Sequence, residues 1–421
     1  MRTFVLIFWL AIVFCLGMVA LPVCAAETWV VNADKIYTAP DAPPLLNGIV
    51  LVKGGRIAAV ADEHARIAIP PDAKVSDCRG VVTAGFQNSH VHFMEAAWND
   101  AADAPAEMLA RHLEAMLTRY GFTTVFDTGS DQSNTVALRD RIETGDVRGP
   151  RILTAGIPLY PPDGIPFYIR DLPPETLAKM HQPRTAAEAR EAVRQNLAGG
   201  ADGTKLFLHT SPGRNEMRFM SLDVARAAVE ETHARGKLVL AHPTSLRGIH
   251  IALAAGVDVL VHTTLGEEAP WDTPTLEKMV ASRMSVIPTF KLWKYELLKE
   301  DVPAPVIEML VNRTLQELRD FRAAGGQVLF GTDVGYMHEY DPTDEYVYMS
   351  NAGMTPMQIL ASLTTAPAAR WKEKNLGRIK AGFDADLVVL AADPQVDVKN
   401  FAQVRCVFRG GKLIYAFERT Q

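Results

Sequence analysis

"FQNSHVHF", residues 86–93, places two histidines, His90 and His92, one residue apart directly after an apolar segment. On a β-strand alternate side chains point to the same face, so both imidazoles project together while Val91 points the other way. The spacing therefore permits both rings to bind one metal ion. It does not establish such a site, because the other ligands must come from elsewhere in the chain.

The stretch belongs to a series of about eight apolar strand segments separated by amphipathic helical patterns, as in repeated βα units. The strand segments are 81–92, 123–129, 151–156, 203–209, 237–242, 258–263, 284–289 and 328–333. Helical patterns include 105–121, 221–236, 273–283 and 303–326. A closed (β/α)₈ barrel needs this number of units, so we expect an α/β fold with a TIM barrel over residues 83–365.

The two ends of the chain differ from this middle part. Residues 27–82 and 366–421 both consist of short strands and turns, with glycine pairs at Gly54–Gly55 and Gly410–Gly411 that are typical of hairpins. We therefore expect a small β-sandwich domain built from both chain ends.

The N-terminus has the pattern of a secretory signal. Arg2 precedes an apolar run over residues 4–21, and small residues suited to cleavage follow at Ala25–Ala26. This predicts a signal peptide over residues 1–26 and an exported, periplasmic or extracellular protein. An uncleaved membrane anchor is the alternative, since the run approaches the roughly 18 residues that span a bilayer. A lipid anchor on Cys24 fits less well, because the residues before it are not small.

The composition is that of a globular protein. The 421 residues are 48% hydrophobic and 22% charged, enough for a large core. The formal net charge is −6 and no dense Lys/Arg run is present, so we expect no nucleic-acid partner. Signal cleavage would leave two cysteines, Cys78 and Cys406. They fit either a disulfide in an oxidising compartment or two separate buried thiols.

Polar residues fall at or near the ends of the predicted strands, where a barrel has its common mouth. They are His90, His92, Lys205, His242, His262 and Asp333. Imidazole and carboxylate groups suit zinc or a similar divalent ion, and four histidines with an aspartate could hold two ions. A protonated Lys205 beside two cations would be strongly unfavourable, so this lysine must be neutral or be converted to an anion.

These segments resemble the motifs of the amidohydrolase superfamily, in the same order along the chain. "GFQNSHVH" resembles that family's first-strand metal motif, "DGTKLFL" its fourth-strand lysine, "LAHP" and "LVHTT" its fifth- and sixth-strand histidines, and "FGTDVG" its eighth-strand aspartate. "GRIKAGFDADLVVL" resembles the segment that returns to the small β-sandwich. The branch that looks most similar contains Xaa-Pro dipeptidases and imidazolonepropionase-related hydrolases.

The resemblance implies a site with two divalent metal ions, expected to be zinc, and with CO₂ bound to Lys205 as a bridging N-carboxylysine. By that carry-over His90, His92 and Asp333 hold the more buried ion, and His242 and His262 hold the more exposed one. Metal-bound hydroxide would attack a C–N bond, and Asp333 would act as the general acid/base. Carbamylation would also remove the unfavourable positive charge of Lys205.

The substrate is less defined by the sequence. The bridging lysine favours peptide or carbamoyl-type amides, so we expect a small-molecule amide or dipeptide. "AHPTS" and "VHTTL" replace the "HAHG" and "EHG" patterns expected in dipeptidases, which leaves the substrate class open. The alternatives are a lactone or phosphotriester hydrolase on the same binuclear site, or a mononuclear cyclic-amide hydrolase or deaminase.

Other residues have secondary roles in this interpretation. Asp127 resembles a second-strand aspartate that supports the framework of the site, and His209 is a candidate for substrate contact. The loop over residues 156–183 suits either a lid or substrate wall over the barrel mouth or an ordered surface loop. Trp271 and Arg214 are weak candidates for the rim. The remaining histidines are expected to be structural or at the surface: His64, His112, His181, His233, His250 and His338.

Overall fold

The computed structural model describes residues 27–417 except for residues 66, 171, 173, 214, 215 and 268. The predicted signal peptide, residues 1–26, and the rim candidate Arg214 lie outside the described residues. Within the described part of the chain, no helix is long and apolar enough to cross a membrane.

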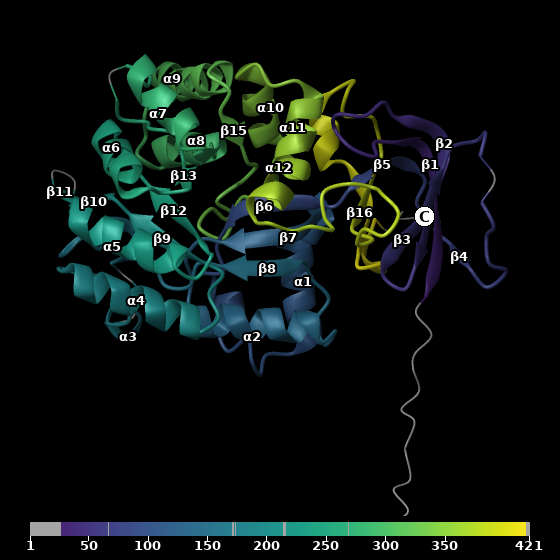
Figure 1. Cartoon of the computed structure of the whole chain (residues 1–421), viewed down its shortest axis with the longest axis horizontal. Helices are drawn as coiled ribbons and strands as arrows, with labels where there is room; N and C mark the ends of the chain where they lie inside the picture. The colour runs from purple at the N-terminus through teal and green to yellow at the C-terminus, as the bar shows by residue number, and fades with distance from the viewer. Residues whose placement is uncertain are drawn as a thin grey trace, which may run out of the picture.

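The middle of the chain contains two parallel sheets, with helices packed around them (Figure 1). The first has the order β6-β7-β8 and the second the order β15-β14-β13-β12-β9. Their bounds are β6 Phe86–Val91, β7 Phe122–Asp127, β8 Arg151–Thr154, β9 Gly203–Phe207, β12 Leu238–His242, β13 Val259–Val261, β14 Ser285–Ile287 and β15 Gln327–Val328. Seven of the eight predicted strand segments therefore contain a strand, whereas the last, 328–333, shares only Val328 with β15.

Helices follow most of these strands, as the alternating pattern predicts. They are α1 Ala106–Met116, α2 Gln132–Glu143, α3 Pro174–Leu177, α4 Ala186–Ala198, α5 Leu222–His233, α6 Leu246–Ala255, α7 Thr273–Ala281, α8 Phe290–Lys299, α9 Ala304–Ala323, α10 Thr343–Asn351, α11 Pro356–Leu363 and α12 Thr365–Arg370. Several begin at a side chain that accepts a backbone N–H of the first turn, for example Asp131 before α2 and Ser221 before α5.

Backbone hydrogen bonds connect the two parallel sheets at both of their edges. On one side Leu159, which follows β8, donates its N–H to the Lys205 carbonyl and accepts from the Phe207 N–H, each at 2.9 Å. On the other side the Asp333 N–H donates to the His90 carbonyl at 2.9 Å. These links bring the carboxyl ends of β6, β9 and the segment after β15 to the same region of the molecule.

A separate eight-stranded sheet contains both ends of the described chain, at the right of Figure 1. Its order is β18-β17-β16-β5-β1-β2-β3, and β4 pairs with β1. The bounds are β1 Thr28–Ile36, β2 Leu45–Lys53, β3 Arg56–Ala61, β4 Lys74–Val75, β5 Gly80–Ala84, β16 Leu387–Leu390, β17 Val404–Arg409 and β18 Lys412–Ala416. Strands from both chain ends therefore belong to one sheet.

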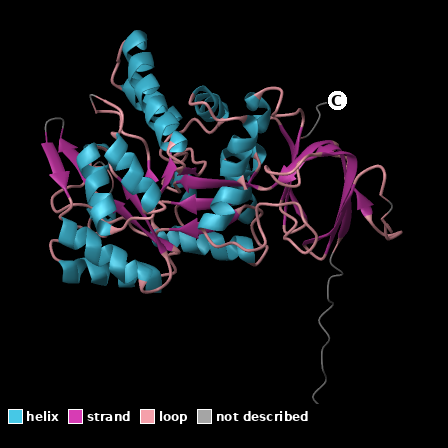
Figure 2. Ribbon diagram, turned by 45° about the horizontal axis from the view of Figure 1, so that its top comes forward, coloured by secondary structure: helices cyan, strands magenta, loops and turns pink. Residues whose placement is uncertain are grey.

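The two faces of this sheet pack against different partners. In β16, Val388 and Leu390 join the main hydrophobic core of the molecule, whereas Leu387 and Val389 join a second cluster. Figure 2 shows the sheet strongly curved. The ring centroids of Trp29 in β1 and Phe408 in β17 lie only 5.7 Å apart, although two other strands lie between β1 and β17 in the sheet order. A flat sheet would place those strands about 14 Å apart, so the sheet curls around its second cluster.

Cys78 and Cys406 form a disulfide, with a Cα–Cα distance of 6.1 Å. This decides between the two alternatives left by the sequence. The bond joins the segment after β4 to strand β17, and its two cysteines are 328 positions apart in the sequence. It therefore connects the first and last parts of the sheet covalently.

Candidate metal centre

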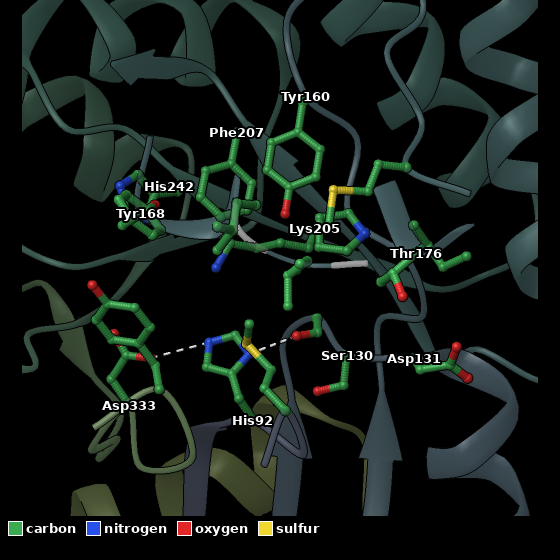
Figure 3. Close-up of a pocket in the computed structure, with 18 of the residues that line it drawn as sticks. His92, Ser130, Asp131, Tyr160, Tyr168, Thr176, Lys205, Phe207, His242 and Asp333 are labelled. Atoms are coloured by element: carbon green, nitrogen blue, oxygen red, sulfur yellow. Dashed lines mark hydrogen bonds and ion pairs between the residues drawn. The ribbon is translucent and has the colours of Figure 1, made fainter. Parts of the chain in front are cut away.

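All six predicted ligands line one cavity of about 730 Å³. The cavity opens at the carboxyl ends of the parallel strands, and Figure 3 shows His92, Lys205, His242 and Asp333 around it. His90 and Lys205 lie in β6 and β9, and His242 ends β12. His92 and His262 directly follow β6 and β13, and Asp333 lies five positions after the end of β15. Residues spread over more than half of the chain therefore meet at one place.

Three of these side chains form a compact group, which we call the inner triad: His90, His92 and Asp333. The Nε2 atoms of the two histidines are 3.1 Å apart, and Asp333 Oδ1 lies 3.2 Å from the first and 3.0 Å from the second. All three residues are buried, and their ligand atoms lie within 4.8 Å of one another. Figure 3 draws the contact between His92 and Asp333.

The hydrogen bond on the far side of the His92 ring fixes its tautomer. His92 Nδ1 lies 2.7 Å from the carbonyl oxygen of Gly129, which can only accept, so Nδ1 carries the proton. Neutral His92 therefore presents an Nε2 lone pair to His90 and to the Asp333 carboxylate. Among the described residues, Asp333 Oδ1 has no hydrogen-bond partner. Lone pairs and a carboxylate at such distances repel one another unless a cation lies between them, so the triad fits a divalent metal ion.

Asp127 supports this arrangement from behind. Its buried carboxylate accepts from the Gly129 N–H at 3.2 Å, from Ser130 Oγ at 2.6 Å and from Thr154 Oγ1 at 2.8 Å. Burial raises the pKa of Asp127, and the nearby His92 lowers it. Since Gly129 in turn accepts from His92, Asp127 lies in the framework position that the sequence suggested.

The other three side chains, which we call the outer group, are Lys205, His242 and His262. His262 Nδ1 donates to Thr289 Oγ1 at 2.5 Å, and this hydroxyl donates to the Pro288 carbonyl, so Nε2 of His262 keeps its lone pair. The rings of His262 and His242 are 4.6 Å apart. His262 Nε2 is 3.9 Å from Asp333 Oδ2, which makes this carboxylate the link between the two sets.

Lys205 is almost fully buried, with 1% of its surface exposed. Burial lowers its pKa to about 8, while the charges of Asp333 and Asp127 oppose that change. A substantial neutral fraction at physiological pH is what reaction of an amine with CO₂ requires. Burial likewise holds the pKa values of His90, His242 and His262 well below the usual range, which keeps the rings uncharged. This donor set fits two divalent ions bridged by a carboxylated lysine.

Two of the predicted ligands and one residue that contacts a ligand have strained backbone conformations. His262, Asp333 and Thr289 all have positive φ angles, of 76°, 64° and 49°. This conformation is costly for non-glycine residues, above all for a β-branched threonine, and such strain clusters at functional sites.

The cavity walls are largely apolar and aromatic. Tyr160 and Phe207 stack with their centroids 4.6 Å apart, and Phe207 stacks on His242 at 4.7 Å (Figure 3). The segment 156–183 contributes much of this wall, including Tyr168, whose ring lies 5.5 Å from that of Tyr336 across the cavity. The segment thus contributes to the wall of the site, one of the two roles considered from its sequence.

Sequence reasoning missed several wall residues and misplaced one. Leu292, Trp293 and Glu296 of α8 line the cavity, and only their position after a predicted strand could have suggested this. Trp271 is buried and donates to Thr264 Oγ1 at 2.9 Å, so it braces the loop after β13 rather than lining the cavity. His209 does line the cavity.

The other six histidines lie outside the cavity lining. The His112 ring contacts the Trp98 ring edge to face, His233 contacts Asp258 at 2.7 Å, and His181 contacts Asn196 at 3.3 Å. These contacts are consistent with the structural roles expected for them.

Comparison with known proteins agrees with this geometry. The model of the amidohydrolase family matches residues 81–414. The chain belongs to the amidohydrolase family. Ochratoxinase from Aspergillus niger is 28% identical over 240 residues, a match covering 54% of this chain and 49% of that protein. The chain thus spans about half the length of the curated relatives it matches.

Solved structures of other amidohydrolases share the fold. A Xaa-Pro dipeptidase with bound methionine superposes with a TM-score of 0.77 at 23% identity, over 93% of this chain and 100% of that one. The A. niger ochratoxinase structure gives a TM-score of 0.75 at 22% identity, over 93% and 96% of the two chains. At these identities the likeness concerns the fold alone.

Proposed function

We propose that this amidohydrolase is a metal-dependent hydrolase that cleaves a C–N bond of an amide or peptide-like substrate. The observation that carries the proposal is the inner triad, where two imidazole Nε2 atoms and one carboxylate oxygen converge within 3.2 Å. Membership of the amidohydrolase family supports it.

Two divalent ions, zinc by our expectation, would lower the pKa of a water molecule and polarise the substrate carbonyl. His90, His92 and Asp333 would hold one ion, and His242 and His262 the other, with carboxylated Lys205 between them. Asp333 is within reach of both sets of ligands, so its carboxylate would take a proton from the attacking water and return it to the leaving nitrogen. The aromatic walls would exclude bulk water from that transfer.

The substrate we propose is a small-molecule amide or dipeptide. Relatives of this fold carry the names ochratoxinase and Xaa-Pro dipeptidase. A cavity of about 730 Å³ lies within the usual range for small-molecule sites, and its apolar wall favours a substrate with an apolar group beside the amide.

The finer architecture is part of the same proposal. The eight parallel strands would form a closed (β/α)₈ barrel, supported by the hydrogen bonds at both sheet edges. The curled eight-stranded sheet would correspond to the β-sandwich, supported by contact between the turn glycines Gly55 and Gly411 of two distant hairpins. Export with removal of residues 1–26 is a further expectation, supported by the Cys78–Cys406 disulfide, since such bonds persist in oxidising compartments.

The test uses the chain from Glu27 onward, loaded with zinc, in wild-type and His92→Ala forms. A panel of dipeptides, N-acyl amino acids, lactones and phosphotriesters is assayed beside metal content by elemental analysis. The proposal expects hydrolysis of amides, lost together with bound metal in the variant. Turnover confined to lactones or phosphotriesters, or metal binding unaffected by the substitution, would overturn it. A His112→Ala variant, altered at an exposed side chain of α1, controls for general damage.

A further inference from the structure

Helix α8 begins without the capping contact that its own sequence would allow. Its N-cap residue is Thr289, a residue type whose hydroxyl commonly accepts a backbone N–H of the first helical turn. Thr289 makes no such bond with any described residue. Its hydroxyl is committed elsewhere, because it accepts from His262 Nδ1 at 2.5 Å and donates to the Pro288 carbonyl at 2.8 Å. The first N–H groups of α8 therefore need another acceptor.

Glu345 of α10 supplies that acceptor from a different helix. Its Oε2 accepts from the Lys291 N–H at 2.9 Å. Only 1% of Glu345 is exposed, and its other oxygen, Oε1, has no hydrogen-bond partner among the described residues. Burial raises the pKa of Glu345 to about 7, and the N–H groups of Lys291 and Phe290 oppose that rise. A buried carboxylate with one oxygen unpaired is costly, so the contact with the start of α8 is what this residue contributes.

The starts of α8 and α10 are joined a second time through the Lys291 side chain. Its ammonium donates to the carbonyls of Glu339 at 2.8 Å and of Asp341 at 2.9 Å, directly before α10. Lys291 thus binds Glu345 through its backbone and the preceding segment through its side chain. These contacts hold the start of α8, and with it the φ angle of 49° at Thr289. Such a conformation is costly for a β-branched residue and persists only where the surrounding structure imposes it.

We propose that Glu345 is a positioning residue for His262. It caps α8 from outside the helix, so that the Thr289 hydroxyl is free to hold the imidazole in the tautomer whose lone pair lies on Nε2. Glu345 acts through Thr289, because it is not among the described residues that line the cavity. The consequence for metal binding rests on the proposed function, in which His262 would bind the outer ion, whereas the orientation of the ring does not.

Histidine-selective ¹⁵N labelling of the metal-free protein reads the imidazole directly by NMR. The wild type should show His262 as a single Nδ1–H tautomer whose N–H exchanges slowly with water, assigned by its absence from His262→Gln. Glu345→Met nearly keeps the size of the side chain and removes both oxygens, so the slow N–H signal should be lost or the tautomers should become mixed. Glu345→Gln retains one acceptor oxygen and should restore the wild-type signal.

Titration of the zinc-loaded proteins with a competing chelator measures the consequence for metal binding. Glu345→Met should weaken the outer ion about 10-fold and leave the inner ion unchanged, since lost orienting contacts of metal ligands cost about 10–100-fold. Asp344→Asn is the matched control. Asp344 precedes Glu345 in α10 and contacts Lys294 of α8 at 3.0 Å, with both side chains exposed. Both measurements should therefore stay as in the wild type.

A second variant keeps the test decisive. If Glu345→Met fails to fold, Glu345→Asp, which withdraws the carboxylate by one methylene, carries the test with a smaller expected change. An unchanged His262 signal in the folded variant, equal weakening of both ions, or the same changes in Asp344→Asn would each overturn the proposal. Absence of amide hydrolysis by the wild type would instead overturn the proposed function alone, because the NMR comparison uses metal-free protein and no substrate.

Discussion

The inner triad and the outer group of the metal centre are held in different ways. Backbone hydrogen bonds fix the inner triad: the Asp333 N–H donates to the His90 carbonyl at 2.9 Å, and the His92 N–H to the Val334 carbonyl at 2.8 Å. Gly335, at φ 94°, allows this close approach, because a Cβ there would collide with the His92 carbonyl. The fold alone thus brings these ligand atoms together.

The outer group depends on side chains instead. Thr289 orients His262, and the loop after β13 is braced where Glu317 accepts from the Thr264 N–H at 2.8 Å. Trp293 donates to Thr263 Oγ1 at 2.8 Å in the same loop. The ligand that would join this group to the triad is a carboxylate that the sequence does not encode. In the proposed binuclear site, an inner ion would therefore find its ligands preassembled, whereas an outer ion would need the modification of Lys205.

The largest effect is expected from Asp333→Asn, because Asp333 serves both sets of ligands. Amide hydrolysis should fall by about 10²–10⁴-fold through loss of the acid/base group alone, and the inner ion should bind more weakly as well. Initial rates and metal content measure both effects. Asp100→Asn, an exposed change at the same cavity, is the control. Equal rates for the two variants would remove Asp333 from the chemistry.

Lys205→Ala should distinguish the inner triad from the outer group by the number of metal ions that the protein binds. Wild-type protein should hold about two ions and the variant about one, retained by the inner triad, because a binuclear site needs the bridging group. After equilibration with ¹³C-bicarbonate, NMR should detect a carbamate carbon in the wild type and in Lys179→Ala, a lysine of the same cavity. One ion in every form, and no carbamate signal, would favour a mononuclear hydrolase.

The contrast between the two sets also explains what the sequence could reveal. His90 and His92 were predictable because they lie at or directly after a strand, and strand periodicity with barrel geometry brings such ends together. Asp333 was predicted at the end of an eighth strand segment, although β15 ends five positions earlier. The contact that braces the outer group was not predictable, because Glu317 lies 53 residues from Thr264 and belongs to no motif. The disulfide was undecided for the same reason: two cysteines 328 positions apart have no local signal.

The cavity wall shows where sequence patterns stop being informative. Tyr168 lines the cavity from a long loop and Phe207 from a short strand. The conformation of a loop follows from packing rather than from sequence periodicity. Trp293 lies in helix α8, whose N-cap is Thr289. The positive φ angle of Thr289 would not be predicted from residue propensities. The wall residues thus come from a loop, a strand and a helix, and their mutual packing has no signal in the sequence pattern.

A matched pair of substitutions tests whether each set has its own support. Thr289→Val removes the acceptor of His262 and should weaken the outer ion about 10–100-fold. Asp127→Asn loosens the Gly129 contact with His92 and should weaken the inner ion by a similar factor. Titration with a competing chelator resolves the two affinities, and each variant is the control for the other. Equal weakening of both ions by either change would mean that the sets are not independent.

The smallest effect on the metal centre is expected from Glu317→Gln, which acts on folding stability instead. Burial raises the pKa of Glu317 to about 8, against the opposing hydrogen bonds from Thr264. In the unfolded chain the group ionises near its ordinary pKa of 4.5. Between these values the folded protein binds more protons, so Glu317 makes stability fall as pH rises through this window, by roughly a few kcal/mol at most.

Glutamine cannot ionise, so the variant should lack this decline while keeping its metal. Denaturant unfolding at several values between pH 5 and about 8.5 measures the slope, with exposed Glu308→Gln on the same helix as control. An unchanged slope would show that Glu317 stays ionised in the folded state, held by both Thr264 donors. In that case the brace behind His262 is a charged one, and its removal should loosen the outer ion after all, which the chelator titration would detect.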